Sequence, residues 1–529
     1  MTLIKSISGF RGTIGGDPDN ALTPLDAVKF AAAYGTWIKQ KSQKGSCSIV
    51  IGRDARPSGD MIQQLVTNTL IGLGINVLDC GLSTTPTVEV MVPMHYADGG
   101  IILTASHNPK NWNALKLLNG KGEFVNAADG AEILALADND KYTFAEVDDL
   151  GVVSELPNAI QLHIDEIMKL DWINVDAIKA ANFKVAIDAV NSTGGISIPP
   201  MLEALGVQNI VPLYCEPNGQ FPHNPEPLKE HLGEIMKVVT EQGCDVGVVV
   251  DPDVDRLALI SENGEMFGEE YTLVAVADYV LGKQKGNTVS NLSSSRALRD
   301  ITEKHGGTYT ASAVGEVNVV TKMKDVNAIV GGEGNGGIIF PELHYGRDSL
   351  VGVALFLSLL AEKKMKTSEL RATYTSYFMA KKKIELTPDL DVDGILEAMA
   401  IKYSHENVNT IDGVKIDFAE NWVHLRKSNT EPIIRIYTEA KSQNEASELA
   451  DRIISEINDQ SVPCFQGSCS EIYLEKAFDE LNIQPPQRLP IAKELGETSL
   501  MFMVHPTLTE AEIDRTCDVI ASTLHRASA

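Results

Sequence analysis

Apolar runs that break into polar turns and then into helix-like segments recur along this 529-residue chain. The runs are SIVIGRD (48–54), KVAIDAVNSTGG (184–195) and GNTVSNLSSSRAL (286–298), and a capped stretch with helical spacing, TPLDAVKFAAAYGTWIKQK (23–41), precedes the first. Strands that alternate with helices pack as α/β layers. Because the chain is too long for one ordinary core, the sequence predicts three related βα domains among three or four in all.

The pattern changes from about residue 387 onward. GVKIDF and WVHLR alternate as half-exposed strands do, PIIRIYTEA follows, and NEASELADRIISEI (444–457) has helical spacing. These segments predict a small C-terminal α+β domain. After residue 460 comes an irregular, proline-containing stretch and then a helix expected at 509–526, so residues 461–529 are expected to form an appended tail.

Composition excludes several classes of protein. Acidic residues outnumber basic ones by 72 to 45, and the formal net charge of −27 argues against nucleic-acid or anionic-membrane partners. No segment approaches the roughly 20 apolar residues of a membrane span, and the N-terminus has no signal-peptide pattern, so a cytoplasmic protein is expected. The seven cysteines lack CxxC spacing, which indicates buried thiols rather than disulfides or a zinc site.

The stretch TASHNPKNWNALK (104–116) follows the apolar run Gly-Ile-Ile-Leu. Small polar residues at a strand end are where α/β folds present reactive side chains, so Ser106 is a candidate nucleophile. His107 is either a general base or a packed histidine, since neighbouring loop residues usually point apart. Lys116 is an alternative acid or base, or an ordinary solvated lysine.

GVVVDPDVDRLAL (247–259) runs from a buried strand into three alternating carboxylates. Asp251, Asp253 and Asp255 on one turn are hard oxygen ligands that suit Mg²⁺. A single capping aspartate would explain an acidic turn, but three within five residues, followed by Arg256, favour a metal site.

Three further segments carry candidate binding groups. LRKSNTEPIIR (425–435) is either a hairpin turn with solvated charges or a phosphate pocket. Its candidate ligands are Arg426, Ser428, Asn429, Thr430 and Arg435. GGEGNGG (331–337) is expected to be a glycine-rich loop, where Glu333 and Asn335 could bind sugar hydroxyls. In GFRGTIGG (9–16), Arg11 is either a phosphate ligand or a surface charge.

TASHNP, DPDVDR, GEGNGG and RKSNTEPIIR, in this order, resemble the four signature loops of the α-D-phosphohexomutase superfamily. The stretches GFRGTIGG, IGRDARPSG, NGQFPHNPEP and TYTASAVGEVNV are similar to that family too. The resemblance covers about residues 1–460. It implies a heart-shaped enzyme of three mixed α/β domains and a C-terminal α+β domain around one cleft. The expected limits are 1–160, 161–268, 269–380, 381–460 and, for the tail, 461–529.

The resemblance also implies a chemistry. Ser106 would be a phosphoserine that, with the three aspartates, holds Mg²⁺, and its phosphoryl group would pass to a hexose phosphate to give a 1,6-bisphosphate. Glucose 1,6-bisphosphate, or the cognate hexose bisphosphate, would be the activator. Lys116 and Arg11 would flank the reacting oxygen, Arg256, Glu333 and Asn335 would contact the substrate, and the 426–435 loop would anchor the other phosphate.

Two departures from the family pattern matter. Many members have GExSGH in the sugar loop, whereas Asn335 and Gly337 stand here at the serine and histidine positions. Proton transfer by that histidine cannot be carried over and would fall to Lys116. Asn429 replaces a frequent glycine in the phosphate loop and tolerates the same left-handed turn.

The variant loops are most similar to phosphoglucosamine mutases, which convert glucosamine 6-phosphate to glucosamine 1-phosphate. Phosphomannomutases and phosphoglucomutases use nearly the same loops, so mannose and glucose phosphates stay open. Sugar phosphates are the expected partners, and the sequence leaves a homodimer open. A phosphohydrolase that loses the Ser106 phosphate to water, and a catalytically silent sugar-phosphate-binding protein, are the competing hypotheses.

The tail resembles a different family. GSCSEIYLEKAFDE and residues 488–520 are similar to the C-terminal end of the DegT/DnrJ/EryC1/StrS sugar aminotransferases. The lysine that binds pyridoxal phosphate in that family lies in a region that this chain lacks. The tail is therefore expected to serve packing, oligomerisation or docking, with no partner identified, rather than aminotransferase chemistry.

Overall fold

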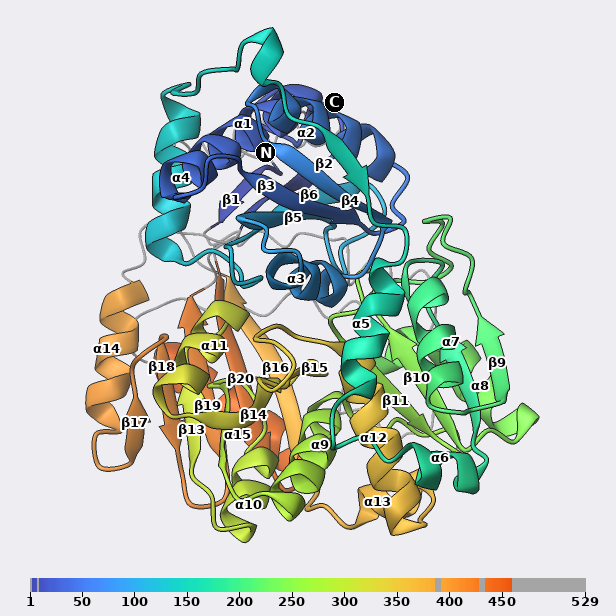
Figure 1. Ribbon diagram of the computed structural model, residues 1–529. Helices are drawn as coiled ribbons and strands as arrows, with labels where there is room; N and C mark the ends of the chain where they lie inside the picture. Colours follow the sequence, from blue (N-terminus) through green and yellow to red (C-terminus); the bar gives the residue numbers. More distant parts are fainter. Residues whose placement is uncertain (1, 7–8, 386–391, 428–432, 459–529) are drawn as a thin grey trace, which may run out of the picture.

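The computed structural model describes residues 2–6, 9–385, 392–427 and 433–458. Four sheets of seven, four, four and five strands organise this part of the chain. Figure 1 shows the first sheet and its helices at the top, the second unit at the lower right, and the third and fourth at the lower left. The mixed α/β architecture predicted from the sequence is confirmed. The predicted tail and its helix lie outside the described residues, and the domain limits stay predictions.

The first sheet has the strand order β1-β2-β6-β5-β3-β4-β7. Its strands are β1 (Ile4–Ser6), β2 (Gly9–Thr13), β3 (Ser48–Arg53), β4 (Asn76–Leu82), β5 (Gly99–Leu103), β6 (Trp112–Leu118) and β7 (Val153–Glu155). The helices are α1 (Pro24–Lys41), α2 (Gly59–Gly72), α3 (Thr85–Met94), α4 (Ala127–Asp138) and the short 3₁₀ turn Val147–Asp149. Helix α1 begins as predicted, because Thr23 and Asp26 form a reciprocal capping box ahead of the chain's helical run. Strand β5 is buried throughout and pairs with β3 in parallel. Its carboxyl end therefore lies beside that of β3, at the side of the sheet where α/β folds place their binding sites.

The second sheet has the order β11-β10-β8-β9. Its strands are β8 (Lys184–Asp188), β9 (Asn209–Leu213), β10 (Val246–Val250) and β11 (Leu257–Ser261). The helices are α5 (Ala159–Met168), α6 (Val175–Ala181), α7 (Gly194–Ala204), α8 (Gly233–Gln242) and the 3₁₀ turn Lys229–His231. The run of valines in β10 is wholly buried, as a strand covered on both faces requires.

The third sheet has the order β13-β12-β14-β15. Its strands are β12 (Asn287–Asn291), β13 (Tyr309–Ser312), β14 (Ala328–Glu333) and β15 (Gly337–Ile339). The helices of this part of the chain are α9 (Glu269–Lys283), α10 (Ala297–Lys304), α11 (Glu316–Asp325), α12 (Ser349–Lys363) and α13 (Thr367–Ala372). Of these, α12 and α13 lie beside the second unit, at the lower right of Figure 1. Side chains of this unit and of the second share one apolar core, to which α9 and α12 contribute most of their length. The two units are therefore joined by a continuous packed interior.

One local prediction is wrong. The segment 331–337 is not a glycine-rich loop, because β14 continues through Glu333 and pairs with β15 as a hairpin. Position 331 in this strand requires glycine, because a Cβ there would come within 2.6 Å of the sulfur of Met323 on α11. Only residues 334–336 form the turn, so Glu333 stands at a rigid strand end.

The fourth sheet is antiparallel, with the order β16-β20-β19-β18-β17. Its strands are β16 (Phe378–Glu385), β17 (Asn407–Asn409), β18 (Val414–Asp417), β19 (Trp422–Lys427) and β20 (Ile433–Ala440). The helices are α14 (Val392–Lys402) and α15 (Gln443–Asn458). The predicted small α+β domain is confirmed, and its strands bury one face under the two helices. The predicted half-exposed alternation is wrong for β19, where Trp422 to Leu425 are buried in succession because both faces of the strand are covered. Within the described residues, no helix combines the length and apolar character needed to cross a membrane.

Candidate active site

Ser106 lies in the loop that follows β5 and has a left-handed backbone, with φ of 49°. Such a conformation costs a non-glycine residue roughly 1–2 kcal/mol, so the surrounding contacts must hold it. The Ser106 N–H donates to Oγ1 of Thr104 at 2.9 Å, and the buried Arg56 guanidinium donates to the Ser106 carbonyl. The Ser106 hydroxyl donates to Oδ2 of Asp251 at 2.8 Å. The strained turn thus aims this hydroxyl at the second unit.

Asp251, Asp253 and Asp255 follow β10 and are fully buried. One carboxylate oxygen from each lies within 4.8 Å of the other two. Val254, between them, adopts φ of 65°, which turns the loop so that the three side chains converge. Oδ1 of Asp253 and Oδ1 of Asp255 are buried without a hydrogen-bond partner among the described residues. Unpartnered anionic oxygens are the donor set of a hard divalent cation, so the residues present fit Mg²⁺.

The pKa values of Asp251 and Asp253 are shifted in opposite directions. Burial raises the pKa of Asp251 well above its usual range, and the charges of Asp255 and Asp253 add to this. Burial also acts to raise the pKa of Asp253, but the Lys116 ammonium outweighs it and lowers the pKa. Asp251 is therefore the carboxyl group that favours a proton when no cation is present, and a bound cation would displace that proton.

Lys116 on β6 is the cation nearest to the aspartates. Its Nζ lies 2.7 Å from Oδ2 of Asp253 and 3.4 Å from Oδ2 of Asp255. Burial acts to lower the pKa of Lys116, but the two carboxylates outweigh it and raise the pKa. Lys116 is therefore charged in this state rather than a free base.

Three other predicted residues line the same space. Arg11 on β2 donates to Oδ1 of Asn108 at 3.1 Å, and Arg256 pairs with Glu226 at 3.2 Å. Burial, reinforced by the charges of Arg256 and Arg11, lowers the pKa of His107 to about 2. His107 is therefore neutral at physiological pH and is a poor general base.

Glu333 and Asn335 come from the β14–β15 hairpin. Oε1 of Glu333 accepts from Nδ2 of Asn291 at 2.9 Å, and Oε2 accepts from the Arg347 guanidinium at 3.1 Å. Oδ1 of Asn335 accepts from the Gly337 N–H at 3.2 Å, which closes the turn. Both side chains line the cavity described below.

The sequence analysis missed Arg347, which joins the aspartate loop of the second unit to two glutamates of the third. Its guanidinium lies 2.8 Å from Asp255, 2.9 Å from Glu316 and 3.1 Å from Glu333. The contacts span 92, 31 and 14 positions of the chain. No local motif marks such a residue, because only the folded loops bring its three partners together. The one feature in the sequence that could have drawn attention to Arg347 is its position directly before Asp348, the N-cap residue of α12.

Arg426 on β19 and Arg435 on β20 are directly paired across neighbouring strands. Both face the cavity, so the fourth sheet presents two guanidinium groups there. Ser428, Asn429 and Thr430 lie outside the described residues.

One cavity of about 870 Å³ brings these groups together. Residues of all four sheets or of their loops line it. The predicted site residues on its wall are Arg11, Ser106, His107, Lys116, Arg256, Glu333, Asn335, Arg426 and Arg435. A volume of this size suits a small polar molecule, and its wall carries cations at both the serine and the fourth-sheet side. The fold and site together define an α/β enzyme that handles phosphorylated small molecules.

Family comparisons agree with this class. Four successive domain models of phosphoglucomutase/phosphomannomutase match residues 3–143, 161–264, 268–377 and 379–456. The first three are described as alpha/beta/alpha domains I to III and the fourth as the C-terminal domain. The chain belongs to the phosphoglucomutase/phosphomannomutase family, within the α-D-phosphohexomutase superfamily, and is therefore an enzyme of the isomerase class.

The match to this chain extends over nearly the whole length of individual relatives. A phosphoglucomutase/phosphomannomutase of Thermococcus kodakarensis is 34% identical over 444 residues, 83% of this chain and 96% of the relative. A phosphoglucosamine/phosphogalactosamine mutase of Sulfurisphaera tokodaii is 33% identical over 465 residues, 86% of this chain and 98% of the relative. A solved family member from Burkholderia thailandensis shares the fold, with a TM-score of 0.76 at 22% identity, over 87% of this chain and 98% of that one.

Proposed function

We propose that this enzyme interconverts hexose 6-phosphates and hexose 1-phosphates through a phosphoserine at Ser106, and that glucosamine phosphate is its preferred substrate. The observation that carries the proposal is the placement of the Ser106 hydroxyl 2.8 Å from Asp251, in a cavity whose far sheet presents paired arginines. A mutase needs both ends, because one phosphate must be held while the other is transferred.

The transfer itself exchanges two oxygen–phosphorus bonds. A sugar hydroxyl attacks the phosphoryl group on Ser106, the Oγ–phosphorus bond breaks, and a 1,6-bisphosphate results. In the reverse sense, the other phosphate of the bisphosphate returns to Ser106. The new bond joins the sugar oxygen to phosphorus. Lys116, charged and 2.7 Å from Asp253, gives its proton to the departing Oγ, and the proton that the attacking hydroxyl releases restores the charge of Lys116. Arg11 flanks the same oxygen.

Asp251, Asp253 and Asp255, with an oxygen of the phosphorylated Ser106, would hold Mg²⁺. When bound, this ion supplies charge neutralisation of the transferring phosphoryl group. Glucose 1,6-bisphosphate, or the cognate hexose bisphosphate, is the proposed activator because it phosphorylates Ser106 at the outset.

Substrate binding falls to the other side of the cavity. Arg426 and Arg435 anchor the phosphate that does not react, together with the loop between them. Glu333 and Asn335 bind sugar hydroxyls, and Arg256 contacts the phosphate that reacts. Glu333 is positioned for this by Asn291 and Arg347, which fix its carboxylate from two sides.

The preference for glucosamine phosphate is supported by relatives. Several are named as probable phosphoglucosamine mutases, among them one of Methanopyrus kandleri, 30% identical over 450 residues. The Thermococcus relative named as a phosphoglucomutase/phosphomannomutase makes glucose and mannose phosphates the alternative.

A ³¹P NMR time course tests this proposal. The enzyme is given Mg²⁺, a trace of glucose 1,6-bisphosphate and, in separate tubes, glucosamine, mannose or glucose 6-phosphate. Growth of a 1-phosphate signal, fastest with glucosamine 6-phosphate, is expected. Faster conversion of another sugar would overturn the substrate preference alone. Inorganic phosphate as the sole product would indicate a phosphohydrolase, and no change in any tube would indicate a binding protein.

A further inference from the structure

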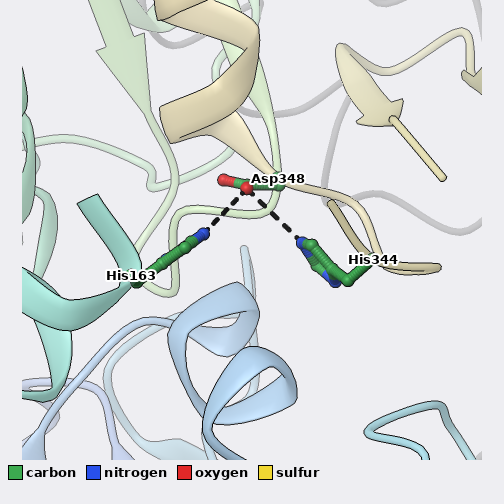
Figure 2. A group of neighbouring side chains, drawn as sticks. All are labelled: His163, His344 and Asp348. Carbon is green, nitrogen blue, oxygen red and sulfur yellow. Dashed lines mark hydrogen bonds and ion pairs between the residues drawn. The ribbon is translucent and has the colours of Figure 1, made fainter. Parts of the chain in front are cut away.

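A second group of potential metal ligands lies outside the active-site cavity. His163 on α5, His344 in the segment after β15, and Asp348 at the start of α12 converge as Figure 2 shows, with both imidazoles directed at one carboxylate. The side chains of His163 and Asp348 are fully buried, and that of His344 is 8% exposed. Three separate segments therefore bring three ligand types together in the interior.

Spacing within the group matches a coordination sphere. Oδ2 of Asp348 lies 3.1 Å from Nε2 of His163 and 3.4 Å from Nε2 of His344, and all three atoms lie within 4.8 Å of one another. Ligand atoms bound tetrahedrally to zinc at about 2.0–2.1 Å are separated from each other by about 3.3 Å. The two printed separations fall on either side of that value.

The remaining polar atoms of His163 and Asp348 have hydrogen-bond partners, whereas Nδ1 of His344 is buried without one among the described residues. Nδ1 of His163 lies 3.0 Å from Oγ1 of Thr87, on α3. Oδ1 of Asp348 accepts from the N–H groups of Leu350 and Val351 at 2.8 and 3.4 Å, as the cap of α12. Metal-binding histidines and carboxylates are usually oriented by outer partners of this kind.

Glu89 on α3 provides an independent observation. Its side chain is 1% exposed, and neither of its carboxylate oxygens has a hydrogen-bond partner among the described residues. Oε2 lies 3.4 Å from Nδ1 of His344, the ring nitrogen that faces away from Asp348. A buried acidic group without hydrogen bonds is costly unless a nearby positive charge compensates it. A divalent cation on the other face of His344 would provide that charge, in a carboxylate–histidine–metal arrangement.

We propose that His163, His344 and Asp348 supply three ligands of a Zn²⁺ ion, with a water molecule completing the tetrahedron and Glu89 as the outer partner of His344. Two imidazoles and one carboxylate are a donor set that zinc prefers over magnesium.

The site would support the active site through short connections. Arg347 precedes Asp348 in the chain and binds Asp255, and the Ser349 N–H donates to the Val254 carbonyl at 3.2 Å. On the other side, α3 begins at Thr85, whose hydroxyl donates to Oδ2 of Asp253 at 2.6 Å. A metal that ties α3, α5 and α12 together therefore holds both flanks of the aspartate loop.

The first experiment uses the full-length, untagged, wild-type protein. After equilibration with Zn²⁺ in excess Mg²⁺ and gel filtration, elemental analysis is expected to find one zinc per chain. Crystal diffraction at the zinc absorption edge is expected to place it between His163, His344 and Asp348. Absence of zinc, or a zinc peak only at Asp251, Asp253 and Asp255, would overturn the proposal without affecting the proposed mutase reaction.

Variants then test the ligand assignment. His344→Gln is expected to abolish zinc binding. Glu89→Gln is expected to raise the dissociation constant for zinc about 10- to 100-fold. His305→Gln is the matched control, because His305 lies 2.7 Å from Asp278 as a partly exposed histidine–aspartate pair outside the cluster. A His344→Gln protein that retains one zinc would overturn the assignment.

A variant could lose zinc because it fails to fold rather than because it lacks a ligand. A measurement on the wild-type protein avoids this ambiguity. Replacement of zinc by Co²⁺ is expected to give the intense visible absorption of a tetrahedral cobalt site with nitrogen and oxygen ligands. A weak octahedral spectrum would contradict the proposed geometry.

Discussion

A Cβ atom at Gly337 would lie 2.3 Å from Cδ of Arg347, so the glycine leaves the space that the arginine fills. The arginine in turn joins Asp255 of the aspartate loop to Glu333 of the β14–β15 hairpin. This pair gives a physical reason why Gly337 stands at the position where many members of the superfamily have histidine. In this chain the side chain of Arg347, from a different segment, fills the space beside Gly337.

Gly337→Ala is expected to displace Arg347 and to lower turnover by about 10- to 100-fold, because the added methyl group cannot be accommodated without moving a buried side chain. Thermal unfolding and steady-state kinetics measure the two effects. Gly45→Ala is the control, since a Cβ there meets nothing within 4 Å. Full activity of Gly337→Ala would contradict the close packing.

Arg347→Met removes one cation from a ring of three buried carboxylates. Asp255, Glu316 and Glu333 would then lose their shared partner, and a buried charge left unpaired typically costs 3–5 kcal/mol. We expect a lower thermal midpoint and at least a hundredfold loss of turnover. Arg347→Lys should recover only part, because one ammonium cannot reproduce three directed contacts. Equal recovery by lysine would contradict the proposed role in alignment.

Lys116→Met is expected to have opposite effects on metal binding and catalysis. The ammonium competes with a cation for Asp253 and Asp255, so its removal should tighten Mg²⁺ binding several-fold. Turnover should fall on the order of 10²- to 10⁴-fold, since a proton donor is lost. Calorimetric titration with Mg²⁺ and ³¹P NMR measure the two. Weaker Mg²⁺ binding would contradict the arrangement.

Lys415 makes folding stability depend on pH. Burial lowers its pKa to about 8, although its ammonium donates to the Leu292 carbonyl at 2.8 Å. Below pH 8 the folded state carries an unfavourable buried charge, worth up to about 3 kcal/mol. Between pH 8 and the unfolded value near 10.5 the unfolded chain binds more protons, so this contribution to stability rises with pH.

Lys415→Met should therefore be more stable than the wild type at pH 7, with the difference shrinking as the pH approaches 10. Chemical denaturation at several pH values measures this difference. Lys237→Met, at a largely exposed lysine on α8, should show no such trend. A difference for Lys415→Met that is constant with pH would contradict the lowered pKa.

The sequence predicted those parts of the fold that local patterns encode. Helix α1 has its threonine cap and first-turn proline, and β10 is a wholly buried run of valines and one glycine. Strand β18 alternates apolar and polar residues in sequence, but burial in β18, β19 and β20 does not alternate. The glycines at 331–332 misled the prediction because flexibility in sequence does not distinguish a loop from a strand packed closely under a helix.

Prediction of the site had a similar limit. Ser106 and the three aspartates belong to short ordered motifs, and the structure brings them together. Arg347 and the cluster around Asp348 depend on contacts between distant segments, such as the 185 positions between His163 and Asp348. Cysteine spacing argued against zinc in the sequence, but a site built of histidine and aspartate from separate segments leaves no such pattern.

The central claim, that Ser106 carries the transferred phosphoryl group, is tested most directly by intact-mass spectrometry. The enzyme is first dephosphorylated and then incubated with Mg²⁺ and glucose 1,6-bisphosphate, and Ser106→Ala is treated in parallel. We predict that the wild-type mass increases by one phosphoryl group, that peptide mapping places it on Ser106, and that a hexose 6-phosphate removes it. An unchanged wild-type mass, or a phosphoryl group that Ser106→Ala also acquires, would contradict the account.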